Sequence, residues 1–478
     1  MTNKIYFLTL FCIACLSLFL RLHELENRPV HHDESINGWF IEKIINEGEY
    51  QYQPRHYHGP TFFWLGFFSS KILGLNLFSI RLVAAVFGFL LCLSPLIVKK
   101  EVGKIGALTA VLAFSIAPAY LYYSRYAIHE ILLACFFTFG ALSLYRFIFS
   151  GKRYFFLTGG LLLGFSAATK ETVIIYSVGI LFGLIMAVFF GRDQSERPVE
   201  LIKKRLLSLD IIMFLVIVLA GLLTWFSLKG LWAFFQSYLF YFNLGTGATG
   251  HEKPWYYFFK LLLEYESFLI MGGAGGIALA VYKRKSFDLF CLGWFMVVFF
   301  VHSIIAYKTP WIIINLTLPL TFLTGSFVNE LLKKMKEPYY RFALIALLVL
   351  LAGKNSYRSI LYSFKYFNEP KNPYAYVQTF TDAHNLSAKI LDILKKNKDI
   401  KVAFVSPMEW PYPFLLRGYD QVVYWRRIPK GLDAEIVVAR DNQYDELPPG
   451  FKENYQREKY KIRRGLNLEL LISKKLLE

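Results

Sequence analysis

With 478 residues, of which 55% are apolar and 18% charged, and a mean hydropathy of +0.39, the chain does not have the composition of a soluble globular protein. Its apolar residues gather in runs near the length that crosses a bilayer, which predicts an integral membrane protein. The net charge of +18 does not indicate a nucleic-acid partner, because much of it lies in short loops between the apolar runs.

Eleven apolar runs are predicted to span the membrane. With the N-terminus inside, this number places the basic loops on the cytoplasmic face, where lysine and arginine are enriched and can also contact anionic lipids. The first run follows Lys4 and lacks a small-x-small cleavage site, so we interpret it as an uncleaved span. The predicted spans are residues 5–21, 79–98, 105–122, 130–149, 154–169, 172–190, 210–228, 258–281, 287–306, 311–329 and 342–357.

These spans divide the chain into two predicted domains. Residues 1–358 form a polytopic α-helical membrane domain with about 11 transmembrane helices, whose large first outer loop covers residues 22–78. Within this loop, residues 61–73 are too short to span comfortably, so we expect a helix at the membrane interface. Residues 359–478 have the composition of a soluble domain, and the odd number of spans places them outside. We therefore expect a multi-pass protein of the cytoplasmic (inner) membrane.

The C-terminal extracytoplasmic domain is predicted to be a small α/β domain. Residues 392–398 continue a helical pattern. Apolar, β-branched runs at residues 401–406 and 434–439 predict buried strands, and residues 460–464 and 468–473 predict a closing hairpin.

Two adjacent carboxylates, Asp33 and Glu34, lie just beyond the first predicted span and follow His31 and His32. Transfer of a sugar from a phosphate-linked donor needs a carboxylate to activate the acceptor hydroxyl. It also needs cations or hydrogen-bond donors that hold the leaving phosphate. Other outer segments supply polar groups of both kinds on the same predicted face, namely His58, Arg125, Glu130, Lys170, His251 and Lys308.

The order of six short motifs resembles the GT-C superfamily of membrane glycosyltransferases. This superfamily includes the protein O-mannosyltransferases and the enzyme that adds aminoarabinose to lipid A. In chain order, the motifs are Asp33-Glu34, His58-Gly59-Pro60, the stretch from Ser124-Arg125 to Glu130, Thr169-Lys170, the stretch from His251 to Tyr257, and Lys308-Thr309-Pro310-Trp311. The combination of His-His-Asp-Glu with His-Gly-Pro is similar to a subfamily described as flippase-activity-associated.

The resemblance implies an inverting transfer of a sugar from a polyprenyl-phosphate donor to an acceptor, which can be a lipid, a glycan or a protein. It makes Asp33 the expected base or acceptor-orienting carboxylate, with Glu34 in a supporting role. The substrate-binding residues that it implies, chiefly for the donor phosphate, are His58, Arg125, Glu130, Lys170, His251 and Lys308.

Simpler interpretations of the acidic motif stay open. Asp33 and Glu34 can be solvated loop charges or N-terminal anions of a helix over residues 36–46. His31, His32 and Asp33 can bind a divalent metal, but adjacent histidines do not readily face one centre. We therefore assign no metal and no other cofactor.

The remaining candidates have structural alternatives as well. His58 can buttress the turn that follows it, and Arg125 and Lys308 can anchor the chain at the membrane interface. Glu171 is expected to form a local ion pair with Lys170.

The leading interpretation is a glycosyltransferase that works with a polyprenyl-phosphate sugar and membrane lipids, and not with nucleic acid. The alternative is a flippase or transporter component, or a non-catalytic binder of lipid-linked glycans. A translocation path would place ionisable residues in the middle of several spans, and few lie there.

Overall fold

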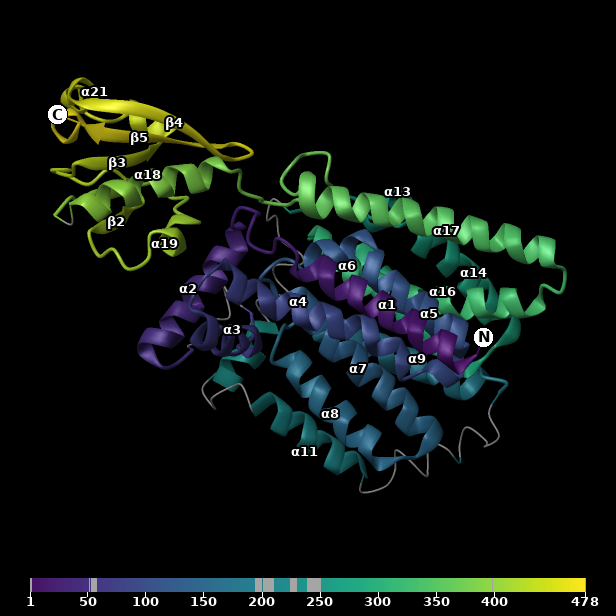
Figure 1. Cartoon of the computed structure of the whole chain (residues 1–478). Coiled ribbons are helices and arrows are strands. Elements are labelled where there is room, and N and C mark those ends of the chain that lie inside the picture. Colours follow the sequence, from purple (N-terminus) through teal and green to yellow (C-terminus); the bar gives the residue numbers. More distant parts are fainter. Residues whose placement is uncertain are drawn as a thin grey trace. The chain divides into compact units, whose positions relative to one another are not determined.

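The structure is a computed structural model that describes residues 2–50, 52, 58–193, 200, 210–223, 230–238, 251–397 and 399–477. It divides into two compact units (Figure 1). The first unit comprises Met1–Leu25 and Gly48–Phe367, and the second comprises Glu26–Glu47 and Asn368–Glu478. The second unit is therefore discontinuous in sequence, and it includes a segment that the sequence analysis assigns to the first outer loop of the membrane domain.

The first unit is built from helices, seven of which are long and apolar enough to cross a membrane. An eighth crossing results if α13 (Tyr257–Tyr265) and α14 (Ser267–Lys283), which are bent by 109° relative to each other, form one broken span. The expected multi-pass helical membrane domain is thus confirmed. Its helices are α1 (Asn3–Leu22), α3 (Thr61–Leu73), α4 (Leu77–Leu93), α5 (Lys99–Ile116), α6 (Pro118–Tyr123), α7 (His129–Ser150), α8 (Arg153–Ala167), α9 (Val173–Phe190), α11 (Asp210–Leu223), α13 (Tyr257–Tyr265), α14 (Ser267–Lys283), α15 (Ser286–Ile304), α16 (Ile313–Lys334) and α17 (Pro338–Ile360).

The prediction of about eleven spans exceeds the seven or eight that the described helices support by length and composition. The helix α5 is too charged for this count, because it includes Lys99, Lys100, Glu101 and Lys104. The helices α8 and α11 are too short for it, with 15 and 14 residues. The apolar run predicted at residues 210–228 ends in residues that lie outside the described part of the chain.

Glycines allow the helices of the first unit to pack closely. A Cβ atom added at Gly293 of α15 would lie 2.7 Å from the Cα atom of Gly183 in α9. A Cβ atom at Gly106 of α5 would lie 2.7 Å from the carbonyl oxygen of Gly325 in α16. Small residues at such crossings let two backbones approach, which is how helices pack within a membrane.

The second unit contains a five-stranded mixed sheet, which confirms the predicted C-terminal α/β domain. The strands lie in the order β2-β1-β3-β5-β4, with β1 parallel to β2 and β3, and β5 antiparallel to β3 and β4. The predicted closing hairpin is the β4–β5 pair, whereas β2 was not predicted. The strands are β1 (Val402–Val405), β2 (Val422–Trp425), β3 (Ile436–Arg440), β4 (Tyr455–Arg463) and β5 (Leu466–Ser473).

Helices cover this sheet and position the acidic motif. The apolar side of α18 (Asp382–Lys396), with Leu386 and Ile390, packs in one core with residues of β1 and β3 such as Phe404. The motif itself begins α2 (His32–Glu47), which packs against the short helix α19 (Tyr412–Leu415). A Cβ atom at Gly38 of α2 would lie 2.4 Å from the ring of Phe414, so a larger residue at this position would displace that ring. Two further short helices, α20 (Asp441–Asp445) and α21 (Pro449–Asn454), connect the later strands.

Candidate functional site

The histidine that precedes α2 fixes the start of this helix. The Nδ1 atom of His31 accepts a hydrogen bond from the backbone N–H of Asp33 at 3.0 Å. Its Nε2 atom lies 2.5 Å from the carbonyl oxygen of Tyr376. A backbone amide can only donate and a carbonyl can only accept, so His31 is the neutral tautomer that carries its proton on Nε2. Both ring nitrogens therefore make hydrogen bonds to the backbone within the second unit.

The two carboxylates of the motif have different surroundings. Glu34 is fully buried, and its Oε2 atom accepts the backbone N–H of His31 at 2.9 Å. This contact satisfies one of the orphan donors at the N-terminus of a helix. Asp33 is partly exposed, and no residue in the described part of the chain makes a hydrogen bond or ion pair with its carboxylate. Of the two predicted catalytic residues, only Asp33 keeps its carboxylate available.

The second histidine of the motif contacts a residue from the far end of the chain. The Nη1 atom of Arg463, the last residue of β4, donates to Nδ1 of His32 at 3.0 Å. Burial lowers the pKa of His32 to about 4, an effect that the charge of Asp33 opposes and that of Arg463 reinforces. His32 is therefore neutral at physiological pH.

In the first unit, the His-Gly-Pro turn packs against the end of α8. The backbone N–H groups of Gly59 and Thr61 donate to the carbonyl oxygens of Thr169 and Ala168, each at 3.2 Å. A Cβ atom at Gly59 would lie 2.1 Å from the oxygen of Ala168, so only glycine fits at this position. Two motifs that are more than a hundred residues apart in sequence, His-Gly-Pro and Thr-Lys, are thus brought together.

A buried carboxylate joins this turn to α8 and α9. The Oε2 atom of Glu171 lies 3.0 Å from Nδ1 of His58, and its Oε1 atom accepts the hydroxyl of Tyr52 at 2.5 Å. Burial raises the pKa of Glu171, but the charge of His58 and hydrogen bonds from His58 and Tyr52 outweigh this effect and lower it. The prediction that Glu171 pairs with its neighbour Lys170 is wrong, because these two side chains have different partners.

The partner of Lys170 is Glu130 at the N-terminal end of α7, and the two form a buried ion pair. The ring of His129 beside Glu130 packs 5.1 Å from the ring of His58 and 5.0 Å from that of Phe62, measured between centroids. Three predicted substrate-binding residues, His58, Glu130 and Lys170, therefore belong to neighbouring parts of the first unit.

The candidates His251 and Lys308 are paired through their backbones. The N–H of Lys308 donates to the carbonyl oxygen of His251 at 3.1 Å, and an antiparallel bridge links Glu252 with Tyr307. The Lys308 side chain is 1% exposed and its Nζ atom donates to the carbonyl oxygen of Ile305. Burial lowers the pKa of Lys308. None of the described carboxylates forms an ion pair with this ammonium.

A histidine of α15 is near both Lys170 and Lys308. His302 is 3% exposed and lies within electrostatic range of both Lys308 and Lys170. The groups around Lys170 and around Lys308 are therefore neighbours in space. His302 had no signal in the sequence, since a single histidine in an apolar run forms no pattern.

Arg125 has a structural role that the sequence could not show. Its guanidinium donates to four carbonyl oxygens at the end of α1, those of Leu20 at 2.9 Å, Arg21 at 3.2 Å, His23 at 2.6 Å and Glu24 at 2.9 Å. The last carbonyls of a helix lack partners within it, and a buried cation satisfies them well. These contacts engage both terminal nitrogens of the guanidinium, Nη1 and Nη2.

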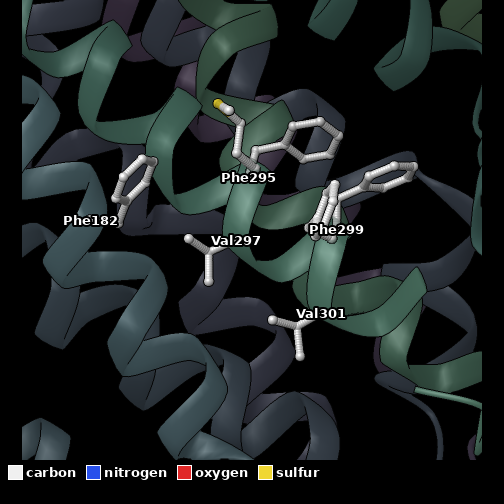
Figure 2. A pocket seen from close by; sticks show the side chains of 7 residues that line it. Phe182, Phe295, Val297, Phe299 and Val301 are labelled. Carbon is white, nitrogen blue, oxygen red and sulfur yellow. The ribbon is translucent and has the colours of Figure 1, made fainter. Parts of the chain in front are cut away.

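Other features of the described residues bear less on the site. They contain no group of three or more histidine, cysteine, aspartate or glutamate residues arranged to hold a metal ion. An apolar pocket of about 370 Å³ lies between α9 and α15, lined by residues such as Phe182, Phe295 and Val301 (Figure 2). It contains none of the candidate residues, and its lining suits hydrocarbon rather than phosphate.

Sequence comparison gives one family match. Residues 57–225, about a third of the chain, match the family model of dolichyl-phosphate-mannose-protein mannosyltransferases. This range includes the His-Gly-Pro turn, Glu130 and Lys170. No curated protein sequence matches the chain.

Solved structures with a similar fold cover nearly the whole chain. ArnT from Cupriavidus metallidurans in the apo state has a TM-score of 0.72 and 13% identity over 98% of both chains. The same protein bound to undecaprenyl phosphate has a TM-score of 0.67 and 14% identity over 99% of both chains. AglB from Archaeoglobus fulgidus, an oligosaccharyltransferase in complex with an inhibitory peptide and a dolichol-phosphate, has a TM-score of 0.57 and 13% identity over 97% of this chain and 74% of that one. The chain thus has an ArnT-like fold, as the order of its motifs predicts.

Proposed function

We propose that the chain is a GT-C-type membrane glycosyltransferase that moves a sugar from a polyprenyl-phosphate donor to an acceptor on the outer face of the cytoplasmic membrane. The ArnT-like fold along 98% of both chains carries this proposal. The family-model match over residues 57–225 supports it independently. ArnT binds undecaprenyl phosphate and AglB binds a dolichol-phosphate in their structures, and both ligands are lipid phosphates of the proposed donor class.

Asp33 is the proposed base. Its carboxylate takes the proton of the acceptor hydroxyl while the oxygen of this hydroxyl attacks the anomeric carbon. The bond between the anomeric carbon and the phosphate oxygen breaks, the sugar carbon inverts, and polyprenyl phosphate leaves. Partial exposure and the lack of a described partner for the carboxylate support Asp33 in this role over Glu34, whose carboxylate caps α2.

Lys308 is the proposed cation for the donor phosphate. A buried ammonium without an anion is costly, and an anionic ligand offsets that cost. The backbone pairing of Lys308 with His251 makes this histidine a second proposed contact. Glu130 and Lys170 neutralise each other, and we propose that they, together with His58, shape the substrate site.

The finer assignment follows from the motifs. His-His-Asp-Glu and His-Gly-Pro support membership of the flippase-activity-associated subfamily. The functional alternative is a flippase or transporter component, or a non-catalytic binder of lipid-linked glycans. This alternative keeps phosphate binding by Lys308 but needs no base at Asp33.

The test is transfer of label from a polyprenyl-phosphate sugar by the purified full-length protein, with a membrane extract as the source of acceptor. We expect Asp33→Asn to lower the rate by about 10²–10⁴-fold, the range typical of general-base catalysis, without lowering the thermal midpoint of unfolding. Lys308→Met should raise the KM for the donor. The matched control is Lys260→Met, because Lys260 is exposed and its nearest carboxylate is that of Glu264 at 3.8 Å.

The outcomes separate the two functions. Absence of transfer by the wild type, combined with donor binding that Lys308→Met weakens, would favour the transporter or binder. Unchanged transfer by Asp33→Asn would remove the proposed base and leave the ArnT-like fold as it stands.

A further inference from the structure

A buried histidine near the C-terminal end of α15 leaves a ring nitrogen without a hydrogen bond in the described part of the chain. His302 is 3% exposed, and its Nε2 atom has no partner among the described residues. Its ring packs against those of Tyr176 in α9 and Phe258 in α13, at 5.9 Å and 6.1 Å between centroids. Buried polar groups nearly always have a partner, and one that has none costs stability. The unpartnered nitrogen of His302 therefore needs an explanation.

A buried cation lies at the same end of this helix. The carbonyl oxygen of Ile305, three residues after His302, accepts a hydrogen bond from Nζ of Lys308. Ile305 still belongs to the last helical turn, since its N–H donates to the carbonyl oxygen of Val301 at 3.0 Å. Residues three apart in a helical turn are neighbours on its surface. The position of His302 within electrostatic range of Lys308 agrees with this geometry.

A short backbone pairing holds Lys308 against the end of α15. Its N–H donates to the carbonyl oxygen of His251, and the N–H of Lys253 donates to that of Ala306, both at 3.1 Å. The last carbonyl groups of a helix lack partners within it, and Lys308 spends one donor on such a group. An ammonium has three N–H donors. The other two have no partner among the described residues, so this cation is positioned but not neutralised.

The ligand that suits these two groups is an anion with several acceptor oxygens. The ammonium of Lys308 supplies positive charge, and a neutral imidazole with its proton on Nε2 supplies one N–H donor. A phosphate accepts charge-assisted hydrogen bonds from both groups at once. The apolar pocket between α9 and α15 includes Val301, the residue before His302 (Figure 2). A phosphate that carries a hydrocarbon chain therefore suits this end of α15.

We propose that His302 is a binding residue for the donor phosphate, and that its Nε2 atom donates a hydrogen bond to a phosphate oxygen beside the ammonium of Lys308. The inference rests on the proposed function of Lys308 as the cation for this phosphate. It explains why a polar nitrogen is kept in the interior of the first unit. The ligand supplies the missing hydrogen bond, so the ligand-free protein bears a cost that binding removes.

The experiment measures the thermal midpoint of the full-length protein in detergent at increasing concentrations of undecaprenyl phosphate, which yields the Kd. His302→Phe keeps a ring and removes both nitrogens. We expect its ligand-free midpoint to equal or exceed that of the wild type, because an apolar group replaces an unpartnered polar one. Its Kd for undecaprenyl phosphate should rise roughly 10–100-fold, the effect of losing a hydrogen bond to a charged group. His302→Gln keeps an N–H donor and should lose less affinity.

The matched control is Trp294→Phe, which removes another unpartnered N–H from the same helix. Trp294 is fully buried two turns before His302, and its Nε1 atom has no partner among the described residues. This variant should keep the wild-type Kd. Undecaprenol, which lacks the phosphate, should bind the wild type and His302→Phe alike. Inorganic phosphate distinguishes the source of the ligand: stabilisation by it as well as by the lipid, lost in His302→Phe, assigns the phosphate group alone, and stabilisation by the lipid only assigns the lipid phosphate.

The contrary outcomes are distinguishable. Equal Kd values for the wild type and His302→Phe would overturn the inference. A lower ligand-free midpoint with an unchanged Kd would also overturn it, because that result marks a structural role only. If His302→Phe does not yield folded protein, the Kd of His302→Leu decides in the same way. Binding is measured without transfer, so the inference can fail while the wild type transfers sugar. A wild type that neither binds the lipid phosphate nor transfers sugar contradicts the proposed function as well.

Discussion

Asp33 and Glu34 are neighbours in sequence, yet the start of α2 gives their carboxylates different surroundings. The buried Glu34 side chain turns back to the N–H of His31 and completes the helix N-terminus. Asp33 leaves its carboxylate partly exposed beside His32 and Arg463. Two identical functional groups, one residue apart, therefore differ in that one caps the helix and the other has no described partner.

This division predicts opposite effects of two conservative substitutions. Glu34→Gln weakens the hydrogen-bond acceptor at the helix N-terminus. It should lower the free energy of unfolding by about 1 kcal/mol, which is the typical stabilisation by a helix cap. Transfer should continue. Asp33→Asn should abolish most of the transfer at an unchanged thermal midpoint. Thermal unfolding in detergent and the transfer assay measure both properties on the same preparations. A loss of transfer confined to Glu34→Gln would exchange the two roles.

His32 predicts a dependence of stability on pH. Its pKa is lowered to about 4 in the folded protein, below the ordinary value of 6.5. The unfolded chain therefore binds a proton more readily, so stability contributed by neutral His32 is present above pH 6.5 and is lost as the pH falls toward 4. The loss is at most about 3 kcal/mol, since each tenfold change in proton affinity corresponds to 1.4 kcal/mol. His32→Asn should flatten the decrease of the thermal midpoint between pH 6.5 and pH 4, and an unchanged slope would contradict it.

At the scale of residues, the sequence could identify a motif but not the contacts of its members. Glu34 stands three residues after His31, the spacing of a capping box, so its structural role had a sequence signal. Arg463 had none, because 431 residues separate it from His32. Glu171 was predicted to pair with its sequence neighbour, whereas the close packing of the Gly59 turn brings His58 to it instead.

Among the elements, the turn at Gly59 is the one that a single methyl group should disturb most. A Cβ atom there would lie 2.1 Å from the carbonyl oxygen of Ala168, which is backbone and cannot rotate away. We expect Gly59→Ala to separate the turn from the end of α8, disturb the contact between His58 and Glu171, and lower both the thermal midpoint and transfer. The control is Gly353→Ala, because a Cβ atom at Gly353 in α17 meets nothing within 4 Å. Alanine in that helix should be neutral or slightly stabilising.

The helices themselves were predictable where apolar runs are long and uncharged. The first span, predicted at residues 5–21, corresponds to α1. The bend of 109° between α13 and α14 was not predictable, since an apolar run of sufficient length looks like one straight helix. The arginine at position 125 was expected either to bind phosphate or to anchor the chain at the interface. In the structure it donates to the carbonyl groups at the end of α1, a contact that the sequence does not show, and its role in phosphate binding stays a prediction.

At the scale of the whole molecule, the number of membrane crossings decides where the second unit faces. An odd number places the two ends of the chain on opposite sides, and an even number places them on the same side. The seven or eight apolar helices leave both parities open, whereas the basic loops favour an N-terminus inside and a C-terminal domain outside.

Cysteine labelling in intact cells tests this arrangement. Asp399 is exposed in the second unit, and Lys152 is exposed between α7 and α8. We expect a membrane-impermeant maleimide to label Asp399→Cys without lysis and to label Lys152→Cys only after lysis. The unsubstituted protein, whose five cysteines lie within helices, provides the background. Labelling of both variants before lysis would contradict the predicted topology.

The discontinuity of the second unit has a consequence for biosynthesis. The helix α2 leaves the ribosome early, whereas the sheet is translated last, and 320 residues lie between Glu47 and Asn368. At about 5–20 residues per second, α2 waits roughly 16–64 s for its partners, with Gly38 and His31 still lacking their packing. Any chain released before the last strands are made keeps its carboxylates but cannot assemble their surroundings. The helix that carries the proposed base therefore completes its packing only when synthesis has almost ended.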